Sequence, residues 1–170
     1  EGRDLAAMSE RELRRIRGNR IAMIFQDPMM TLNPVLTIGT QMVEALLAHR
    51  KISKKEARAI ALDRLQKVQI PSPEKRLDQY PHELSGGMRQ RVIIAIALLL
   101  DPEIIIADEP TTALDVTIQA EIMDLLLNLC EQENVALMLI THDLRHALTI
   151  ADRVSVIRQG QALETAPAQA

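Results

Sequence analysis

The chain has 170 residues and almost no cysteine or aromatic side chains. Cys130 is the only cysteine, which excludes a disulfide within the chain and a metal site built from several thiolates. Phe25 and Tyr80 are the only aromatic residues, so the sequence offers little for stacking on nucleic-acid bases. The formal net charge of −3 also lacks the positive surplus that binds a phosphate backbone. This composition argues against nucleic acid as the main partner.

Long apolar runs are missing as well. No stretch reaches the roughly 18 uninterrupted apolar residues that a membrane-spanning helix requires, and no signal-peptide pattern opens the sequence. Hydrophobic residues make up 47% and charged residues 25%, which is ordinary for one globular domain. We therefore expect any contact with a membrane to be made through a partner.

A glycine pair opens a predicted helix in the segment Leu-Ser-Gly-Gly-Met at 84–88. Ser85 is a favoured N-cap residue, and Gly86 and Gly87 allow a ligand to approach the backbone closely. No helix breaker follows from Met88 to Leu100. The free N–H groups and the positive dipole end of such a helix suit a phosphate. An isolated Ser-Gly-Gly is also typical of a plain turn before a core helix, so this segment alone decides nothing.

Two acidic residues follow a short apolar run. Residues 103–107 are rich in isoleucine and predict a strand of a parallel sheet, buried on both faces. Ligands bind beyond the carboxyl ends of such strands, where Asp108 and Glu109 lie. One carboxylate can hold Mg²⁺ through water while the other orients or deprotonates an attacking water. The alternative is that both acids merely cap the next turn.

A histidine follows the next predicted strand. Residues 135–140 have the composition of another buried strand, and His142 comes directly after Thr141. In a parallel sheet this histidine would lie at the same edge as Asp108 and Glu109. A single histidine is more often a packed or surface residue, but the order of these pieces favours a shared site.

Five segments together resemble the ATP-binding subunit of ABC transporters, most closely the branch of oligopeptide and dipeptide importers, which also includes nickel importers. The segment 84–88 is similar to the family's signature motif, and 104–109 is similar to its Walker B strand. Residues 113–115 (Ala-Leu-Asp) resemble the D-loop, His142 the switch histidine, and Gln26 the Q-loop glutamine. The resemblance covers nearly the whole chain, and its joint pattern is highly specific.

The resemblance implies an α/β fold of the P-loop NTPase (RecA-like) type, with a mostly parallel sheet and an inserted helical subdomain. We expect residues 1–36 and 101–170 to form part of the RecA-like core, and residues 37–100 to form the helical subdomain with the signature motif. None of the six glycines is followed by lysine, so the phosphate-binding G-x-x-x-x-G-K-[ST] is absent. Because the family has this motif upstream of the Q-loop, we expect the N-terminal strands and the P-loop to be missing here, and this fragment to be unable to hydrolyse ATP alone.

The implied function is to bind and hydrolyse ATP and so to power import of peptides or similar small solutes through a membrane permease. The resemblance assigns Glu109 as general base or water-orienting group, His142 as the contact to the γ-phosphate, and Gln26 as a sensor near Mg²⁺. Asp108 would hold Mg²⁺ through water, with Gln26 as the second metal-binding candidate. The nucleotide-binding set is Ser85, Gly86, Gly87, Asp108 and Asp115, of which the signature residues would act on the nucleotide of a partner.

The cofactors implied are ATP and Mg²⁺. The implied partners are a second ATP-binding subunit in a homo- or heterodimer, transmembrane permease subunits and, indirectly, a solute-binding protein, with no nucleic acid. The location implied is peripheral, at the cytoplasmic face of the plasma membrane.

Two alternatives stay open. The first is an ABC-type ATPase acting on DNA or ribosomes, although the zinc-binding cysteines, heptad insertions and basic arms common in such proteins are lacking. The second is a non-catalytic half that supplies its signature motif to a partner's site, although such a half has no physical need of Glu109 and His142.

Overall fold

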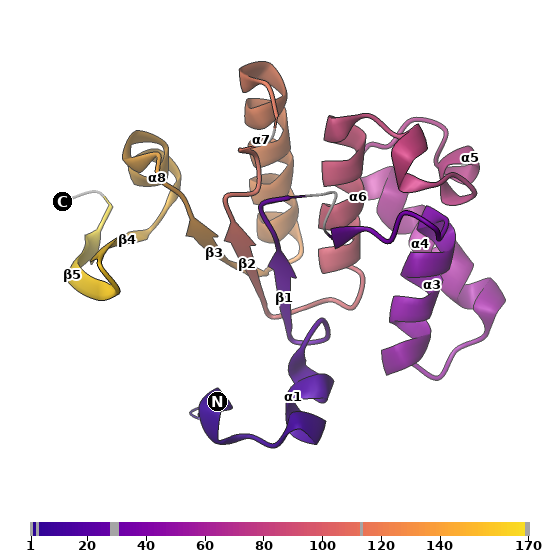
Figure 1. The fold of residues 1–170 in the computed structure, drawn as a ribbon, viewed down its shortest axis with the longest axis horizontal. Helices are drawn as coiled ribbons and strands as arrows, with labels where there is room; N and C mark the ends of the chain where they lie inside the picture. Colours follow the sequence, from indigo (N-terminus) through magenta and orange to yellow (C-terminus); the bar gives the residue numbers. More distant parts are fainter. Residues whose placement is uncertain (1, 3, 28–30, 113, 169–170) are drawn as a thin grey trace.

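A computed structural model describes residues 2, 4–27, 31–112 and 114–168 of the chain. Pro28 and Ala113, which belong to the predicted Q-loop and D-loop segments, lie outside the described residues. The fold combines a three-stranded sheet, a set of helices beside it and a two-stranded hairpin (Figure 1). In chain order the elements are η1 (Leu5–Ala7), α1 (Glu10–Ile16), β1 (Ile21–Ile24), α3 (Ile38–His49), α4 (Lys54–Lys67), α5 (Pro73–Leu77), η2 (Pro81–Glu83), α6 (Gly86–Ala97), β2 (Ile104–Asp108), α7 (Val116–Gln132), β3 (Ala136–Ile140), α8 (Leu144–Ile150), β4 (Arg153–Arg158) and β5 (Gln161–Pro167).

Strands β1, β2 and β3 pair in parallel in that order. Ile24 pairs with Ala107, and Ala107 pairs with Leu139, so the carboxyl ends of all three strands meet at one edge. The prediction that the residues after these strands share an edge is therefore confirmed. The short, β-branched segments explain the strands, and the long connections through helices explain why the pairing is parallel.

One face of the sheet is covered by α6 and α7, and its residues Ile24 and Ile105 are fully buried in the core. The opposite face is not covered by any part of the chain that the structure describes. On β3, Met138 is 52% exposed, and Ala136 and Ile140 are exposed as well. The prediction that β2 and β3 are buried on both faces is thus wrong, because α6 and α7 cover one side only: Ile104 and Ile106 of β2 are half-buried and Met138 of β3 is exposed.

Local side-chain chemistry explains where several helices begin. Ser53 caps α4 by accepting a hydrogen bond from the amide of Glu56, whose carboxylate accepts one from the amide of Ser53 in return. Asp115 caps α7 in the same way as Ser85 caps α6. Helix α7 then buries one apolar stripe against the sheet, which includes Ile122 and Leu126. These starts and this stripe agree with the sequence pattern.

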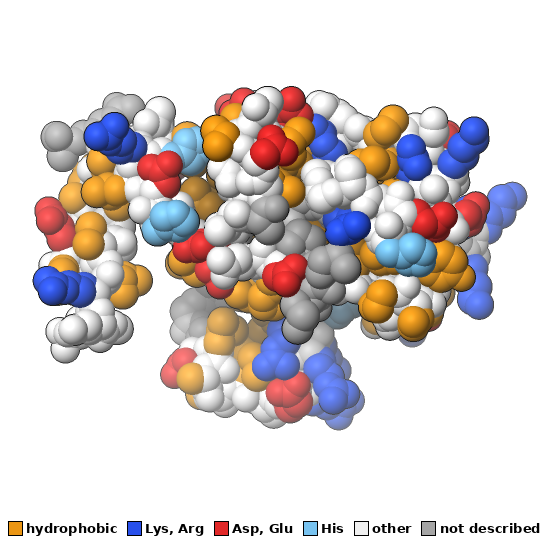
Figure 2. Space-filling view, turned by 45° about the horizontal axis from the view of Figure 1, so that its top comes forward, with side chains coloured by type: hydrophobic (Ala, Val, Ile, Leu, Met, Phe, Trp, Pro, Cys, Tyr) orange, Lys and Arg blue, Asp and Glu red, His pale blue; other side chains and the backbone are white. Residues whose placement is uncertain are grey.

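The C-terminal hairpin of β4 and β5 is antiparallel and packs beside α8 rather than joining the larger sheet. Figure 2 shows apolar side chains at the surface of this lobe, at the left of the view. Ile157 and Leu163 are among its exposed apolar residues. The hairpin therefore contributes little to the core.

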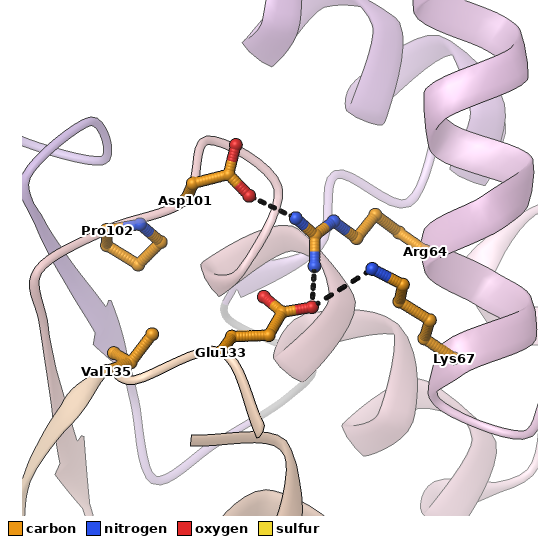
Figure 3. A pocket seen from close by; sticks show the side chains of 6 residues that line it. All are labelled: Arg64, Lys67, Asp101, Pro102, Glu133 and Val135. Carbon is orange, nitrogen blue, oxygen red and sulfur yellow. Dashed lines mark hydrogen bonds and ion pairs between the residues drawn. The ribbon is translucent and has the colours of Figure 1, made fainter. Parts of the chain in front are cut away.

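A cluster of charges joins α4 to the turns that precede β2 and β3 (Figure 3). We call Arg64, Lys67, Asp101 and Glu133 the Arg64 cluster. The Arg64 side chain is 9% exposed and donates to the carboxylates of Asp101 and Glu133, while Lys67 Nζ lies 3.2 Å from Glu133 Oε1. These residues line a cavity of about 270 Å³. Asp101 precedes β2 and Glu133 ends α7, so one guanidinium ties α4 to both turns.

We expect Arg64→Met to destabilise the fold by about 3–5 kcal/mol, because a largely buried ion pair loses one partner. Glu133 has a side chain that is 18% exposed and would be left with Lys67 alone. Urea denaturation measures the loss. Arg58→Met is the matched control, because the Arg58–Asp78 pair is exposed and such pairs contribute about 0–1 kcal/mol. Equal losses in both variants would contradict a structural role specific to Arg64.

Candidate functional site

Two side chains that follow β1 and β3 contact the carboxylate of Glu109, which follows β2. Gln26 Nε2 donates to Glu109 Oε2 over 3.0 Å, and His142 Nδ1 lies 2.9 Å from Glu109 Oε1. Gln26 follows β1, Glu109 follows β2, and His142 follows β3. The structure therefore brings together the three residues predicted to act in catalysis.

The backbone explains why Glu109 faces this edge. Its φ angle is +44°, a left-handed conformation that is unusual for a residue other than glycine. Its amide donates to the carbonyl of Ile140 over 2.9 Å, which continues the pairing of β2 with β3 for one more residue. The strand ends at Asp108, and the left-handed backbone of Glu109 removes its side chain from the regular alternation of the sheet.

Asp108 is the last residue of β2 and pairs in register with Ile140. Its side chain is half-buried, and among the described residues no hydrogen bond or ion pair to its carboxylate is found. Gln26 uses its amide nitrogen on Glu109, which leaves the Gln26 carbonyl oxygen available. Asp108 and Gln26 therefore offer two oxygen ligands of the kind that Mg²⁺ prefers.

Hydrogen bonding shifts the proton affinities of Glu109 and His142 in opposite directions. The hydrogen bond with His142, followed by that from Thr112, holds the pKa of Glu109 below its usual range. The same contact with Glu109, together with the negative charge of Glu109, raises the pKa of His142. The contribution of Glu109 to stability is lost as the pH falls through its lowered pKa, and that of His142 is lost as the pH rises through its raised pKa. Both groups are therefore charged together in the window between the two pKa values.

We expect Glu109→Gln to lower the pKa of His142, because the hydrogen-bonded carboxylate that favours the imidazolium is removed. An NMR titration of the His142 ring protons in this chain measures the change. Glu164→Gln, on the exposed strand β5, is the control and should leave the His142 titration where it is. An unchanged His142 titration in Glu109→Gln would contradict the contact between the two side chains.

The signature residues lie at the start of α6, next to the start of α7. Ser85 Oγ accepts from the amide of Met88 over 3.3 Å. A Cβ at Gly87 would lie 3.0 Å from Ile118 Cγ2, so glycine permits this close approach of the two helices. Ser85 precedes the 12-residue helix that begins at Gly86, and among the described residues no hydrogen bond is found from the amides of Gly86 and Gly87, which leaves these two N–H groups for a ligand.

Asp115 is placed as an N-cap, with Oδ1 accepting from the amide of Ile118 over 3.1 Å. Within the described part of the chain, no hydrogen bond or ion pair connects Asp115 or Ser85 to Gln26, Glu109 or His142. The predicted residues therefore form two sets. Gln26, Glu109 and His142 lie at the sheet edge, whereas the signature residues and Asp115 lie at the starts of α6 and α7.

Thr112 belongs to the site and was missed by the sequence analysis. Its hydroxyl donates to Glu109 Oε2 over 3.0 Å. A hydroxyl three residues after a carboxylate can close a turn in this way, and this spacing is the signal that the sequence contained.

A family model described as ABC transporter matches residues 1–112. The chain belongs to the ABC transporter family. This membership confirms the resemblance drawn from the signature, Walker B and switch segments.

Among similar ABC transporter proteins are two from Bacillus subtilis (strain 168). The oligopeptide transport ATP-binding protein OppD is 53% identical over 165 residues, which cover 97% of this chain and 46% of that protein. The dipeptide transport ATP-binding protein DppD is 55% identical over 164 residues, which cover 96% and 49%. The chain thus spans about half the length of the curated relatives it matches.

Solved ABC transporter structures share the fold. The ATP-binding cassette MJ0796, solved as a dimer in a post-hydrolysis state bound to ADP and Pi, aligns with a TM-score of 0.81 and 31% identity. The alignment covers 96% of this chain and 69% of that one. The predicted P-loop NTPase type of α/β fold is confirmed, while the division of the chain at residues 37 and 100 stays a prediction.

Proposed function

We propose that this chain carries part of the ATP-hydrolysing machinery of a subunit that powers import of peptides or similar small solutes. The observation that carries the proposal is the Glu109 carboxylate, held between Gln26 and His142 at the carboxyl edge of a parallel sheet. The names of the relatives, which are oligopeptide and dipeptide transport ATP-binding proteins, support peptides as the class of solute.

The chemistry proposed is attack of water on the γ-phosphoryl group of ATP. Glu109 orients the water or accepts its proton, and its charged state is the one that can do so. His142, whose side chain is 74% exposed, is free to reach a phosphate oxygen while its Nδ1 stays on Glu109. A charged imidazole there favours the growing negative charge of the transition state. Gln26 contacts the same carboxylate, so its position depends on whether Mg²⁺ and the attacking water are bound beside Glu109.

Asp108 and the Gln26 carbonyl are the proposed protein contacts of Mg²⁺, directly or through water. When bound, the ion would neutralise negative charge on the phosphates. The described residues contain no group of three or more His, Cys, Asp or Glu side chains that would hold a metal unaided. This agrees with the usual Mg²⁺ site, which takes one or two carboxylates and completes its shell with phosphates and water.

A complete nucleotide site also needs the backbone cradle and lysine of G-x-x-x-x-G-K-[ST], which these 170 residues do not contain. We propose that this chain does not hydrolyse ATP by itself. The residues at its sheet edge act when a P-loop is supplied, and the start of α6 acts on the nucleotide of a second subunit.

The proposed partners are a second ATP-binding subunit, permease subunits and, indirectly, a solute-binding protein. The chain would act at the cytoplasmic face of the membrane through these partners. In the described residues, no helix is both long enough and apolar enough to cross a bilayer. The retained contact of Glu109 with His142 favours a catalytic subunit over a purely structural half.

In a subunit that joins this chain to a P-loop, Glu109→Gln should lower ATP turnover by about 10²–10⁴-fold, because a general base or water-orienting group is lost. Binding of MgATP should be unchanged, because the amide is close in size to the carboxylate. Phosphate release and equilibrium nucleotide binding are the two measurements, with Glu164→Gln as the surface control. Turnover that survives in Glu109→Gln would remove this residue from the chemical step.

The role of the signature residues predicts that this chain raises the ATP turnover of a P-loop-containing partner when the two are mixed. Ser85→Arg should abolish the increase, because a bulky cation would fill the space at the start of α6. Gln66→Arg, on the exposed face of α4, adds the same charge elsewhere and should have no effect. If mixing never raises turnover, or if Ser85→Arg behaves like Gln66→Arg, the action on a partner's nucleotide is refuted.

A further inference from the structure

In the turn that follows β2, Thr112 makes two hydrogen bonds to Glu109. The amide of Thr112 donates to the carbonyl of Glu109 over 3.3 Å, and the hydroxyl of Thr112 donates to Glu109 Oε2 over 3.0 Å. The backbone and the side chain of Glu109 are therefore both tied to Thr112. This matters because the left-handed backbone of Glu109 takes its side chain out of the alternation that would otherwise direct it.

The same turn is anchored to α7. Gln119 Nε2 donates to the carbonyls of Thr111 and Leu114, each over 3.0 Å. The amide of Leu114 also donates to the carbonyl of Thr111 over 3.0 Å. Gln119 stands on the helix whose Ile122 and Leu126 lie in the core. The turn that carries Thr112 is thus held on both sides of Thr112 by a packed helix, and not only by its own backbone hydrogen bonds.

The two oxygens of the Glu109 carboxylate have different partners. His142 contacts Oε1, while Gln26 and Thr112 both contact Oε2. A carboxylate offers about four acceptor positions, so these three contacts set its orientation and leave room for about one more donor, such as a water. Gln26, His142 and Thr112 are all exposed, but only Thr112 lies on the turn that Gln119 of α7 holds. Thr112 is the partner that a braced turn holds in place.

We propose that Thr112 is a positioning residue for Glu109, with Gln119 bracing the turn that carries the Thr112 hydroxyl. The inference deepens the proposed function, since it concerns the same carboxylate. Thr112 itself touches neither water nor nucleotide in this role. It selects one orientation of the carboxylate, and an error of about 1 Å in such an orientation can cost on the order of 10²-fold in rate.

Crystal structures of this chain and of its Thr112→Val and Thr112→Ser variants test the position directly. Valine keeps the shape of threonine but cannot donate, so we expect the Glu109 carboxylate to leave its place between Gln26 and His142. Serine retains the donor and should restore that place. Thr117→Val, at an exposed position on α7, is the matched control. A carboxylate that stays in place in Thr112→Val would overturn the proposal.

Kinetics of the subunit that contains a P-loop test the consequence. Thr112→Val should lower kcat by about 10- to 100-fold with the KM for MgATP unchanged, and Thr112→Ser should recover the wild-type kcat. A raised KM for MgATP with an unchanged kcat would overturn the positioning role. A Thr112→Ser variant that does not recover the wild-type kcat would overturn it as well. So would a displaced carboxylate with an unchanged kcat.

Gln119→Leu provides a second variant that reaches the same carboxylate from α7, should Thr112→Val fail to fold. It removes the brace of the turn and should shift Glu109 and lower kcat in the same direction, whereas an unshifted Glu109 would contradict the bracing. If the wild-type subunit hydrolysed no ATP at all, the proposed function would be refuted. The crystal structures would still decide whether Thr112 holds the carboxylate.

Discussion

The parallel pairing of three short strands is the constraint on which the rest of the site depends. Ile24, Ala107 and Leu139 are paired in register across β1, β2 and β3. Gln26 and Glu109 come two residues after their paired positions, and His142 comes three residues after its own. Because parallel strands end at the same edge, these offsets place an amide, a carboxylate and an imidazole side by side, and the left-handed backbone of Glu109 directs the carboxylate between the other two. A shift of register by one residue would separate them.

Burial decides which charged contacts serve the fold and which are available for chemistry. At the amino ends of β2 and β3, the guanidinium of Arg64 is nearly inaccessible and is matched by two carboxylates. Such a charge is tolerated only when paired, so it acts as a structural tie. At the carboxyl ends, His142 is exposed and pairs with a carboxylate that still has an acceptor position left. The same kinds of charge thus have opposite roles at the two edges of one sheet.

The sequence predicted those features that depend on residues close together along the chain. The caps at Ser53 and Asp115 depend on residues three positions apart, and the shared edge of Glu109 and His142 depends on where apolar runs end. It could not predict the open face of β3, because apolar composition gives no information about what lies against Met138 in space. It also missed Thr112, because the spacing of a hydroxyl three residues after a carboxylate is a weak signal as long as the left-handed backbone at Glu109 is not known.

The start of α6 shows why a glycine must be interpreted in its packing context. Gly87 has a reason within this chain, because a Cβ there would press on Ile118 at 3.0 Å. A Cβ at Gly86 would make only an ordinary contact with Leu114 at 3.4 Å, so packing does not require glycine at that position. Leu114 in turn belongs to the turn that Gln119 braces and that carries Thr112. The turn that holds the Glu109 carboxylate therefore also lies beside the start of the signature helix, so the two groups of predicted site residues are neighbours although no hydrogen bond between them is found in the described residues.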